Sequence, residues 1–267
     1  MNRVIPLLVA STIGCTQLGP MPATTAISHI PSGRPGVELT GGSVPGYFLS
    51  AGTQDDPDNA SMPQASLTFE PDRLIGVPGV YAGVRGVGGN DSDAYAEPLL
   101  GYRLRLDRER RFSAGAALFA TGASDDRKGA SYSMTRGGGE LGGDVRVTPE
   151  SDYAELHVSL GASVVGVDAD GKYCLGIDGR YGVDCPDEER VLTAASVSGW
   201  YPALNTGLYL DFGRDLRGAF HGGRLAFLFS TGTQPRLVAA EQVDPESYTS
   251  FGLSLSLGFG AFASKDD

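Results

Sequence analysis

The feature that most constrains the fold is a two-residue alternation of apolar and polar side chains, which recurs along most of the chain. It is clearest over residues 152–167, where Ala154, Leu156, Val158, Leu160, Ala162 and Val164 alternate with Tyr153, Glu155, His157, Ser159, Gly161 and Ser163. Successive side chains of a strand point to opposite faces, so a period of two indicates a strand with one apolar face. Because no segment shows a clear helical period, the sequence predicts an all-β fold.

Eleven segments are candidate strands, with bounds uncertain by a few residues. They are residues 36–50, 64–73, 78–88, 94–106, 111–121, 131–147, 152–167, 190–201, 204–213, 222–231 and 247–262. Many are longer than the five or six residues usual in soluble proteins and reach the roughly 9–11 residues of a transmembrane strand. Bacterial barrels usually have an even number of strands, and residues 204–213 are the weakest candidate. We therefore predict ten strands, with eight and twelve as the alternatives.

Composition limits the kinds of partner and the ways of crossing a membrane. Glycine makes up 39 of the 267 residues, about twice the usual share of about 7%, which suits turns and curved sheets and disfavours helices. The 21 basic and 32 acidic residues give a net charge of −11, which argues against nucleic acid as a partner. No apolar run reaches the roughly 18 residues of a membrane helix. If the chain crosses a membrane, it must do so as a closed barrel.

The connections between the candidate strands fall into a short and a long class. The sequences DRER, TPESD and YPAL are short, whereas GTQDDPDNASMP, GASDDRKGA and residues 168–189 are long, polar and mostly acidic. Short turns at one end and long loops at the other are typical of outer-membrane barrels. Five aromatic residues lie close to the short connections, where an interfacial aromatic girdle is expected: Tyr102, Phe112, Tyr153, Trp200 and Tyr201.

Over residues 36–262 this pattern resembles the small bacterial outer-membrane β-barrels, and the segment SYTSFGLSLSLGFGAF is similar to their C-terminal assembly signal. The resemblance implies a closed, antiparallel, up-and-down transmembrane β-barrel in the bacterial outer membrane, with membrane lipid as its partner and residues 263–267 as a polar tail. Apolar faces would contact lipid and polar faces would line the lumen. The polar residues expected in the lumen are Arg103, Arg105, Glu155, His157 and Ser159, with Glu97, Glu140 or Glu155 as partners for the arginines.

The N-terminus has the features of an export signal. The sequence MNRVIPLLVASTIGC has a basic start at Arg3, an apolar run over residues 4–10 and small residues before Cys15. It resembles a bacterial lipoprotein signal, which implies that residues 1–15 end at a lipidated Cys15. The alternative is an ordinary secretory signal that is cut later, near PATTA. The proline-rich residues 16–35 are predicted to form a flexible tether with little structure.

The chain has three cysteines, and two of them lie close together in the longest predicted loop. Cys174 and Cys185 bracket the ten residues LGIDGRYGVD. Two thiols this close in a flexible loop of an exported protein are expected to form a disulfide. Zinc is the competing interpretation, but no histidine or further cysteine lies nearby to complete four ligands. We therefore predict a Cys174–Cys185 bridge and no metal site.

One pair of residues raises the possibility of catalysis. His157 and Ser159 share one face of a strand with Glu155, and the His-x-Ser pair resembles that of the outer-membrane lipid A deacylases, which implies acyl-ester hydrolysis. A serine nucleophile needs an adjacent base, and the base needs an orienting carboxylate. However, this pair lies on the polar face, which would be the lumen, whereas the substrate of that family is a lipid. We interpret the two residues as a hydrogen-bonding pair that lines the lumen.

The sequence therefore predicts a non-enzymatic outer-membrane β-barrel lipoprotein, without a cofactor, which has acidic extracellular loops and a structural or surface-interaction role. One alternative is a soluble, lipocalin-like periplasmic barrel that binds a small apolar ligand, with an apolar interior and a polar exterior. The other is an outer-membrane lipid acyl-ester hydrolase. The sequence identifies no protein partner. Which side of the strands is exposed and apolar discriminates between the first two hypotheses.

Overall fold

The structure is a computed structural model, which describes residues 17–22, 37–50, 59–70, 76–87, 95–106, 111–127, 130–151, 153–175, 181–182, 191–212, 220–238 and 241–259. These residues form twelve strands: β1 Gln17–Pro22, β2 Val37–Ser50, β3 Asn59–Phe69, β4 Val80–Val87, β5 Tyr95–Arg105, β6 Phe112–Arg127, β7 Ala130–Arg146, β8 Ala154–Leu175, β9 Tyr181–Gly182, β10 Val191–Phe212, β11 Phe220–Val238 and β12 Glu241–Phe259. Within this described part, no helix is long and apolar enough to cross a membrane.

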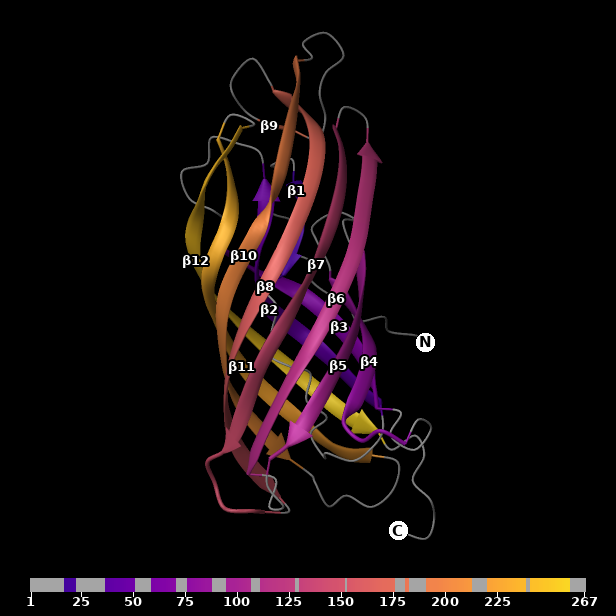
Figure 1. The fold of residues 1–267 in the computed structure, drawn as a ribbon, viewed down its shortest axis with the longest axis vertical. Helices are drawn as coiled ribbons and strands as arrows, with labels where there is room; N and C mark the ends of the chain where they lie inside the picture. The colour runs from indigo at the N-terminus through magenta and orange to yellow at the C-terminus, as the bar shows by residue number, and fades with distance from the viewer. Residues whose placement is uncertain are drawn as a thin grey trace, which may run out of the picture.

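Ten of the twelve strands close into an antiparallel barrel (Figure 1). Going around the wall, the order is β2, β12, β11, β10, β8, β7, β6, β5, β4 and β3, and β3 pairs again with β2. The two remaining strands are additions, since β1 pairs with β2 and β9 pairs with β8. The prediction of an all-β, closed, antiparallel barrel with ten strands is confirmed.

Eleven candidate segments correspond to ten barrel strands because two of the segments belong to one strand, β10. This strand covers both candidate segments 190–201 and 204–213, and it pairs with β8 without a break from Val191 to Phe212. The prediction of a short turn at YPAL is therefore wrong. Pairing of β10 with β11 begins only at Ala203, so Pro202 stands at an edge of that ladder, where a missing N–H is tolerated.

Several strands extend into segments that the sequence analysis predicted to be loops or tether. Strand β6 continues to Arg127 and β7 begins at Ala130, so only residues 128–129 separate them. Strand β8 continues to Leu175. Gln17–Pro22 forms β1, so the prediction of an unstructured tether does not hold for these six residues. The sequences of these extensions are rich in polar residues, glycine or proline and lack a clear apolar alternation, so periodicity did not reveal them.

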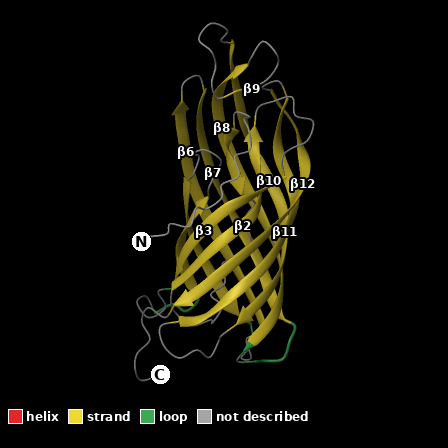
Figure 2. Ribbon diagram, turned by 180° about the vertical axis from the view of Figure 1, so that it is seen from behind, coloured by secondary structure: helices red, strands yellow, loops and turns green. Residues whose placement is uncertain are grey.

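The barrel wall is much taller on one side than on the other. We call the lower end the one at which β2 begins and β12 ends, where Val37 pairs with Phe259. Strands β8 and β10 have 22 residues each, whereas β4 has 8 and β5 has 11. Figures 1 and 2 show the long strands rising well above the others. The upper part of the barrel is therefore bounded mainly by β6, β7, β8, β10, β11 and β12.

A glycine fixes the turn that enters β4 at the lower end. Gly79 has φ of 85°, and a Cβ atom there would come within 2.1 Å of the carbonyl oxygen of Arg103. Its own carbonyl accepts a 2.7 Å hydrogen bond from the backbone N–H of Arg103. Both the backbone conformation and the close approach of the chains require glycine at this position.

Candidate functional site: the outer surface and the lumen

An apolar belt surrounds the lower part of the barrel. Every one of the ten barrel strands contributes at least one large, exposed apolar side chain to it: Leu39, Leu67, Val84, Leu100, Leu118, Leu141, Leu160, Leu204, Phe227 and Phe251, from β2, β3, β4, β5, β6, β7, β8, β10, β11 and β12 respectively. Soluble monomers rarely expose a continuous apolar surface of this extent. An outward apolar band on a closed barrel is the arrangement found in transmembrane barrels.

The two faces of β5 illustrate the separation between the outer surface and the lumen. Leu100 and Leu104 are 58% and 47% exposed, whereas Arg103 is 7% exposed. The alternation read from the sequence thus places the leucines outside and this arginine inside the barrel. The side chain of Arg105 lies outside the described part of the structure, although its backbone pairs with Ser113 of β6.

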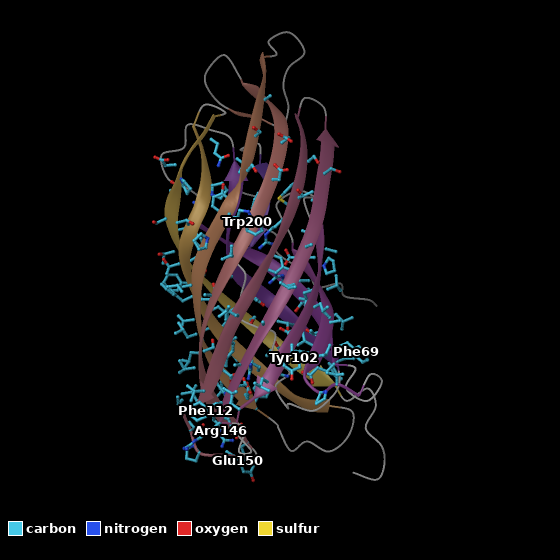
Figure 3. All side chains as sticks on the ribbon, viewed as in Figure 1. Phe69, Tyr102, Phe112, Arg146, Glu150 and Trp200 are labelled. Atoms are coloured by element: carbon cyan, nitrogen blue, oxygen red, sulfur yellow. The ribbon has the colours of Figure 1, made fainter. Side chains whose placement is uncertain are left out.

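Exposed aromatic side chains lie at two levels of the belt. Tyr102 and Phe112 lie near the lower end and Trp200 lies much higher (Figure 3), and Trp200 is 70% exposed. The prediction that Trp200 and Tyr201 lie beside a short turn is wrong, because both belong to the middle of β10. Tyr201 points inward and is 3% exposed. The prediction failed because YPAL, which has the composition of a turn, lies inside β10.

Trp200 marks the upper edge of the apolar belt. Its indole ring lies across Gly166 of β8, where a Cβ atom would be 3.0 Å from the ring. Above this level, the outward residues of β8 and β10 become polar: Asp168, Asp170, Ser196 and Ser198 are all exposed. From Trp200 down to Leu210, ten residues at about 3.3 Å each, inclined by about 40°, give a height of about 25 Å. This is the height expected of a lipid-facing band.

The lower lumen is filled with paired charges. Arg103 donates to Glu70 at 2.6 Å, and Arg146 donates to Glu155 at 2.9 Å. Arg224 makes two bonds to Asp211, of 2.5 and 2.6 Å. Buried charges are tolerated when they are paired and hydrogen-bonded in this way.

A second ion-paired group lies higher in the lumen. Glu97 is fully buried and accepts hydrogen bonds from Arg85 and Arg136, the latter at 2.5 Å. The guanidinium groups of both arginines also lie over the ring of Phe119, at 5.5 and 5.1 Å from its centroid. A carboxylate between two arginines is a strong charge-assisted arrangement, and the aromatic ring adds a cation–π contribution.

The arginine partners differ in part from those expected. Arg103 pairs with Glu70, a residue that sequence analysis did not select. Glu70 follows β3 on the same face as Thr68, and both are buried. The alternation along β3 could therefore have predicted that Glu70 faces the lumen. Glu140 lies close enough to Arg85 and Arg136 to interact with their charges, whereas Glu97 and Glu155 form ion pairs with arginines.

His157 and Ser159 both lie in the lumen and are 7% and 2% exposed. The Nδ1 atom of His157 is 3.0 Å from Asp144, and its Nε2 atom is 3.6 Å from Asp211 and 3.7 Å from Glu155. Ser159 donates its hydroxyl proton to Tyr209 at 3.1 Å. The serine hydroxyl is thus directed to a tyrosine, and His157 is surrounded by carboxylates. This geometry is that of a hydrogen-bonded lining and lacks the serine–histidine contact of a nucleophilic pair.

The cysteine predictions concern mostly residues outside the described part of the structure. Cys15 and Cys185 lie outside it, as does the predicted polar tail at residues 263–267. The backbone of Cys174 pairs with Leu192 of β10 and with Gly182 of β9, near the upper end of β8. The lipidation and the disulfide stay predictions. Among the described residues, no group of three His, Cys, Asp or Glu side chains is arranged to hold a metal ion.

The upper lumen has a different lining. Met134, Ala169 and Val197 are cross-strand partners on β7, β8 and β10, and their exposures are 1%, 1% and 0%. They form a continuous apolar row on the inner face. The outward row next to it is Thr135, Asp168 and Ser198, all exposed. At this row the wall is apolar inside and polar outside, whereas two residues away on the inner face of β7 lies the buried, ion-paired Arg136.

No protein-family model matches this chain, and no curated protein matches it. Among solved structures, it is similar to Ail, the attachment invasion locus protein of Yersinia pestis, with 11% sequence identity and a TM-score of 0.33. That match covers 85% of this chain and 99% of Ail. We draw nothing about function from a likeness this distant.

Proposed function

We propose that this chain is a non-enzymatic outer-membrane β-barrel protein with a structural or surface-interaction role, exported and lipidated at Cys15. The observation that carries the proposal is the apolar belt, which includes all ten barrel strands and encloses a lumen of paired charges. In water, such a belt would expose apolar surface on every side. In a bilayer it contacts hydrocarbon, and closure of the barrel satisfies the strand backbones.

The non-enzymatic assignment is supported by the surroundings of His157 and Ser159. Ser159 is hydrogen-bonded to Tyr209, and His157 faces Asp144, Asp211 and Glu155. Both side chains are buried in the lumen, away from the apolar belt that would contact a lipid substrate. We infer that the pair contributes to the packing and hydrogen bonding of the lumen.

The decisive experiment places an arginine within the belt and, as a control, above it. Leu160→Arg lies in the belt, whereas Ser196→Arg lies on the outer face above Trp200. An arginine in the hydrocarbon centre lowers the free energy of unfolding by about 2–4 kcal/mol, and near the interface by about 0–1 kcal/mol. Urea titration of the protein in lipid vesicles, followed by the fluorescence of the single tryptophan, measures both values.

Equal effects of the two substitutions would contradict the assignment of the belt to lipid. Recovery of the wild-type protein from the periplasm in soluble form, without detergent, would contradict the membrane location altogether. That second outcome would favour the soluble lipocalin-like alternative.

A further inference from the structure

Along one row, the upper barrel wall has the polarity of a soluble ligand-binding barrel. Its inner row of Met134, Ala169 and Val197 is apolar and almost fully buried. On its outer face, Asp168 and Ser198 are exposed at a level where the belt has ended. Ligand sites in proteins are typically lined by apolar side chains. We refer to the inner row as the upper apolar row.

The N-terminal strand β1 lies in this part of the barrel. Strand β1 lies close to β7 and β8, the strands that carry Met134 and Ala169. Strand β1 also pairs with the upper half of β2, from Gln17 opposite Ser50 to Pro22 opposite Gly46. It therefore reaches from the β2 edge toward the wall that carries the upper apolar row.

Strand β1 occupies a position on β2 that β12 would otherwise take. Lower in the barrel, β12 pairs with this same edge of β2, and the pairing ends at Leu253 opposite Ser43. The same register continued upward would set Ser250 against Gly46 and Glu246 against Ser50. These are the β2 residues to which β1 is bonded. Strand β2 therefore pairs with β12 up to Ser43 and with β1 from Gly46 onward, so the seam between β2 and β12 is open in the upper barrel.

The pairing of β1 with β2 is weak by its composition. It involves five residue pairs with an irregularity between Gln17 and Gly19. Pro20 and Pro22 have no N–H to donate to the ladder. By comparison, the pairing of β12 with the lower half of the same strand extends over seven consecutive pairs. A short strand with two prolines is held less firmly than the wall strands around it.

We propose that the upper apolar row is part of a binding site for an apolar molecule, such as a hydrocarbon chain or a neutral aromatic compound, and that β1 is a displaceable resident of this site. When β1 leaves, the inner faces of β7 and β8 that it approaches become available to the ligand, next to Val197 of β10. Strand β2 can then extend its pairing with β12 up to Glu246. The new hydrogen bonds between β2 and β12 offset those lost between β2 and β1. The release of β1 is therefore a local rearrangement at one edge of β2.

The test uses the methyl signal of Met134 as a local probe. The chain has four methionines, so 13C-methyl labelling gives a simple spectrum, and Met134→Leu assigns the signal. The full chain and a variant lacking residues 17–22 are placed in phosphatidylcholine nanodiscs and titrated with N-phenyl-1-naphthylamine. We expect a saturable shift of the Met134 signal, with an apparent Kd at least tenfold lower in the deletion variant than in the full chain.

Matched substitutions on β10 show whether the shift reports the inner face. Val197→Phe fills the upper apolar row and is expected to abolish the saturable shift. Ser198→Phe places the same ring on the exposed outer face and is expected to leave the shift unchanged. If Val197→Phe fails to fold, Ala169→Leu fills the same row from β8. If the deletion variant fails to fold, Leu18→Asp/Met21→Asp introduces charge into the segment in its place.

The outcomes are separated from those of the proposed function by measuring folding first, from heat-dependent migration in gels. Protein that folds and inserts but gives no saturable Met134 shift, with or without residues 17–22, overturns the binding site. An equal affinity of the two chains overturns the role of β1. A shift that survives both Val197→Phe and Ala169→Leu shows that the probe binds in the bilayer only. None of these results bears on the apolar belt, which the vesicle titration tests separately.

Discussion

At the scale of single residues, the buried ion pairs of the lumen carry the largest expected effects. Glu97 is fully buried between Arg85 and Arg136. Removal of one partner from a buried ion pair leaves an uncompensated charge, which is far more destabilising than the net contribution of the pair.

We therefore predict that Glu97→Gln lowers the free energy of unfolding by about 3–5 kcal/mol, because two buried guanidinium groups lose their countercharge. Glu150→Gln is the matched control, since Glu150 is 58% exposed and lies 3.9 Å from Arg146. An exposed pair of this kind contributes about 0–1 kcal/mol. The urea midpoints of the two variants in vesicles check the difference. Similar midpoints would show that the Glu97 cluster is not a buried ion-pair site.

Two glycines of one turn separate backbone strain from steric overlap. Gly76 and Gly79 both have positive φ, of 68° and 85°, but a Cβ atom at Gly76 meets nothing within 4 Å. We expect Gly76→Ala to destabilise the protein by about 1–2 kcal/mol because of its left-handed backbone. Gly79→Ala adds overlap with Arg103, and overpacking adds about 1–3 kcal/mol. Thermal or urea unfolding of both variants gives the comparison, and equal losses would rule out the close contact.

At the scale of the element, β10 combines two kinds of surface along its length. On β10, the outward residues Leu204 and Leu208 belong to the belt, and Ser196 and Ser198 lie above it. The inward residues change in the opposite sense, from Asp211 and Asn205 to Val197. The change occurs near Trp200, because lipid replaces water as the outer solvent there in the proposed membrane location.

Accessibility along β5 tests this orientation in the proposed membrane location. Cysteines placed one at a time at positions 104 and 105, with Cys174 and Cys185 changed to serine, are expected to react differently. Leu104→Cys lies on the exposed apolar face and should react with a lipid-soluble maleimide. Arg105→Cys should be protected from that reagent, because adjacent residues of a strand face opposite sides. The reverse pattern would mean that the polar face contacts lipid.

At the scale of the whole molecule, the barrel is a tall, uneven cylinder in which only the lower part has a complete ring of belt residues. The upper part rises beyond that ring on the long strands β6, β7, β8, β10, β11 and β12 (Figure 2). In the proposed membrane location, these long strands continue above the bilayer. Such an extension suits a protein with a surface-interaction role.

The covalent state of the mature chain is the remaining prediction at this scale. We expect acyl chains on Cys15 and a bridge between Cys174 and Cys185, both of which intact mass under non-reducing conditions measures. A bridge across a loop of this size adds at most about 3 kcal/mol and restrains the loop more than the barrel. Two alkylatable thiols in the loop would contradict the bridge. A mature N-terminus downstream of Cys15 would contradict the lipidation.

The sequence by itself determined the class of fold and the two faces of the belt strands. Alternation over residues 152–167 places Leu160 outside and Glu155 inside, as the structure has them. The reason is local, because the pleat of a strand fixes which side chains share a face once the strand exists. The even strand number that closed bacterial barrels favour led from eleven candidate segments to ten strands, with eight and twelve left open.

Only the tertiary structure decided which side chains form ion pairs and which strands are neighbours. Arg103 meets Glu70 across 33 positions of sequence, and Glu97 meets Arg136 across 39, since register brings distant strands together. The same holds for the continuity of β10, which depends on its unbroken ladder with β8. The position of β1 also depends on an edge of β2 that β12 leaves unpaired. Periodicity reports the face of each side chain, whereas its partners depend on strand register, which no single segment contains.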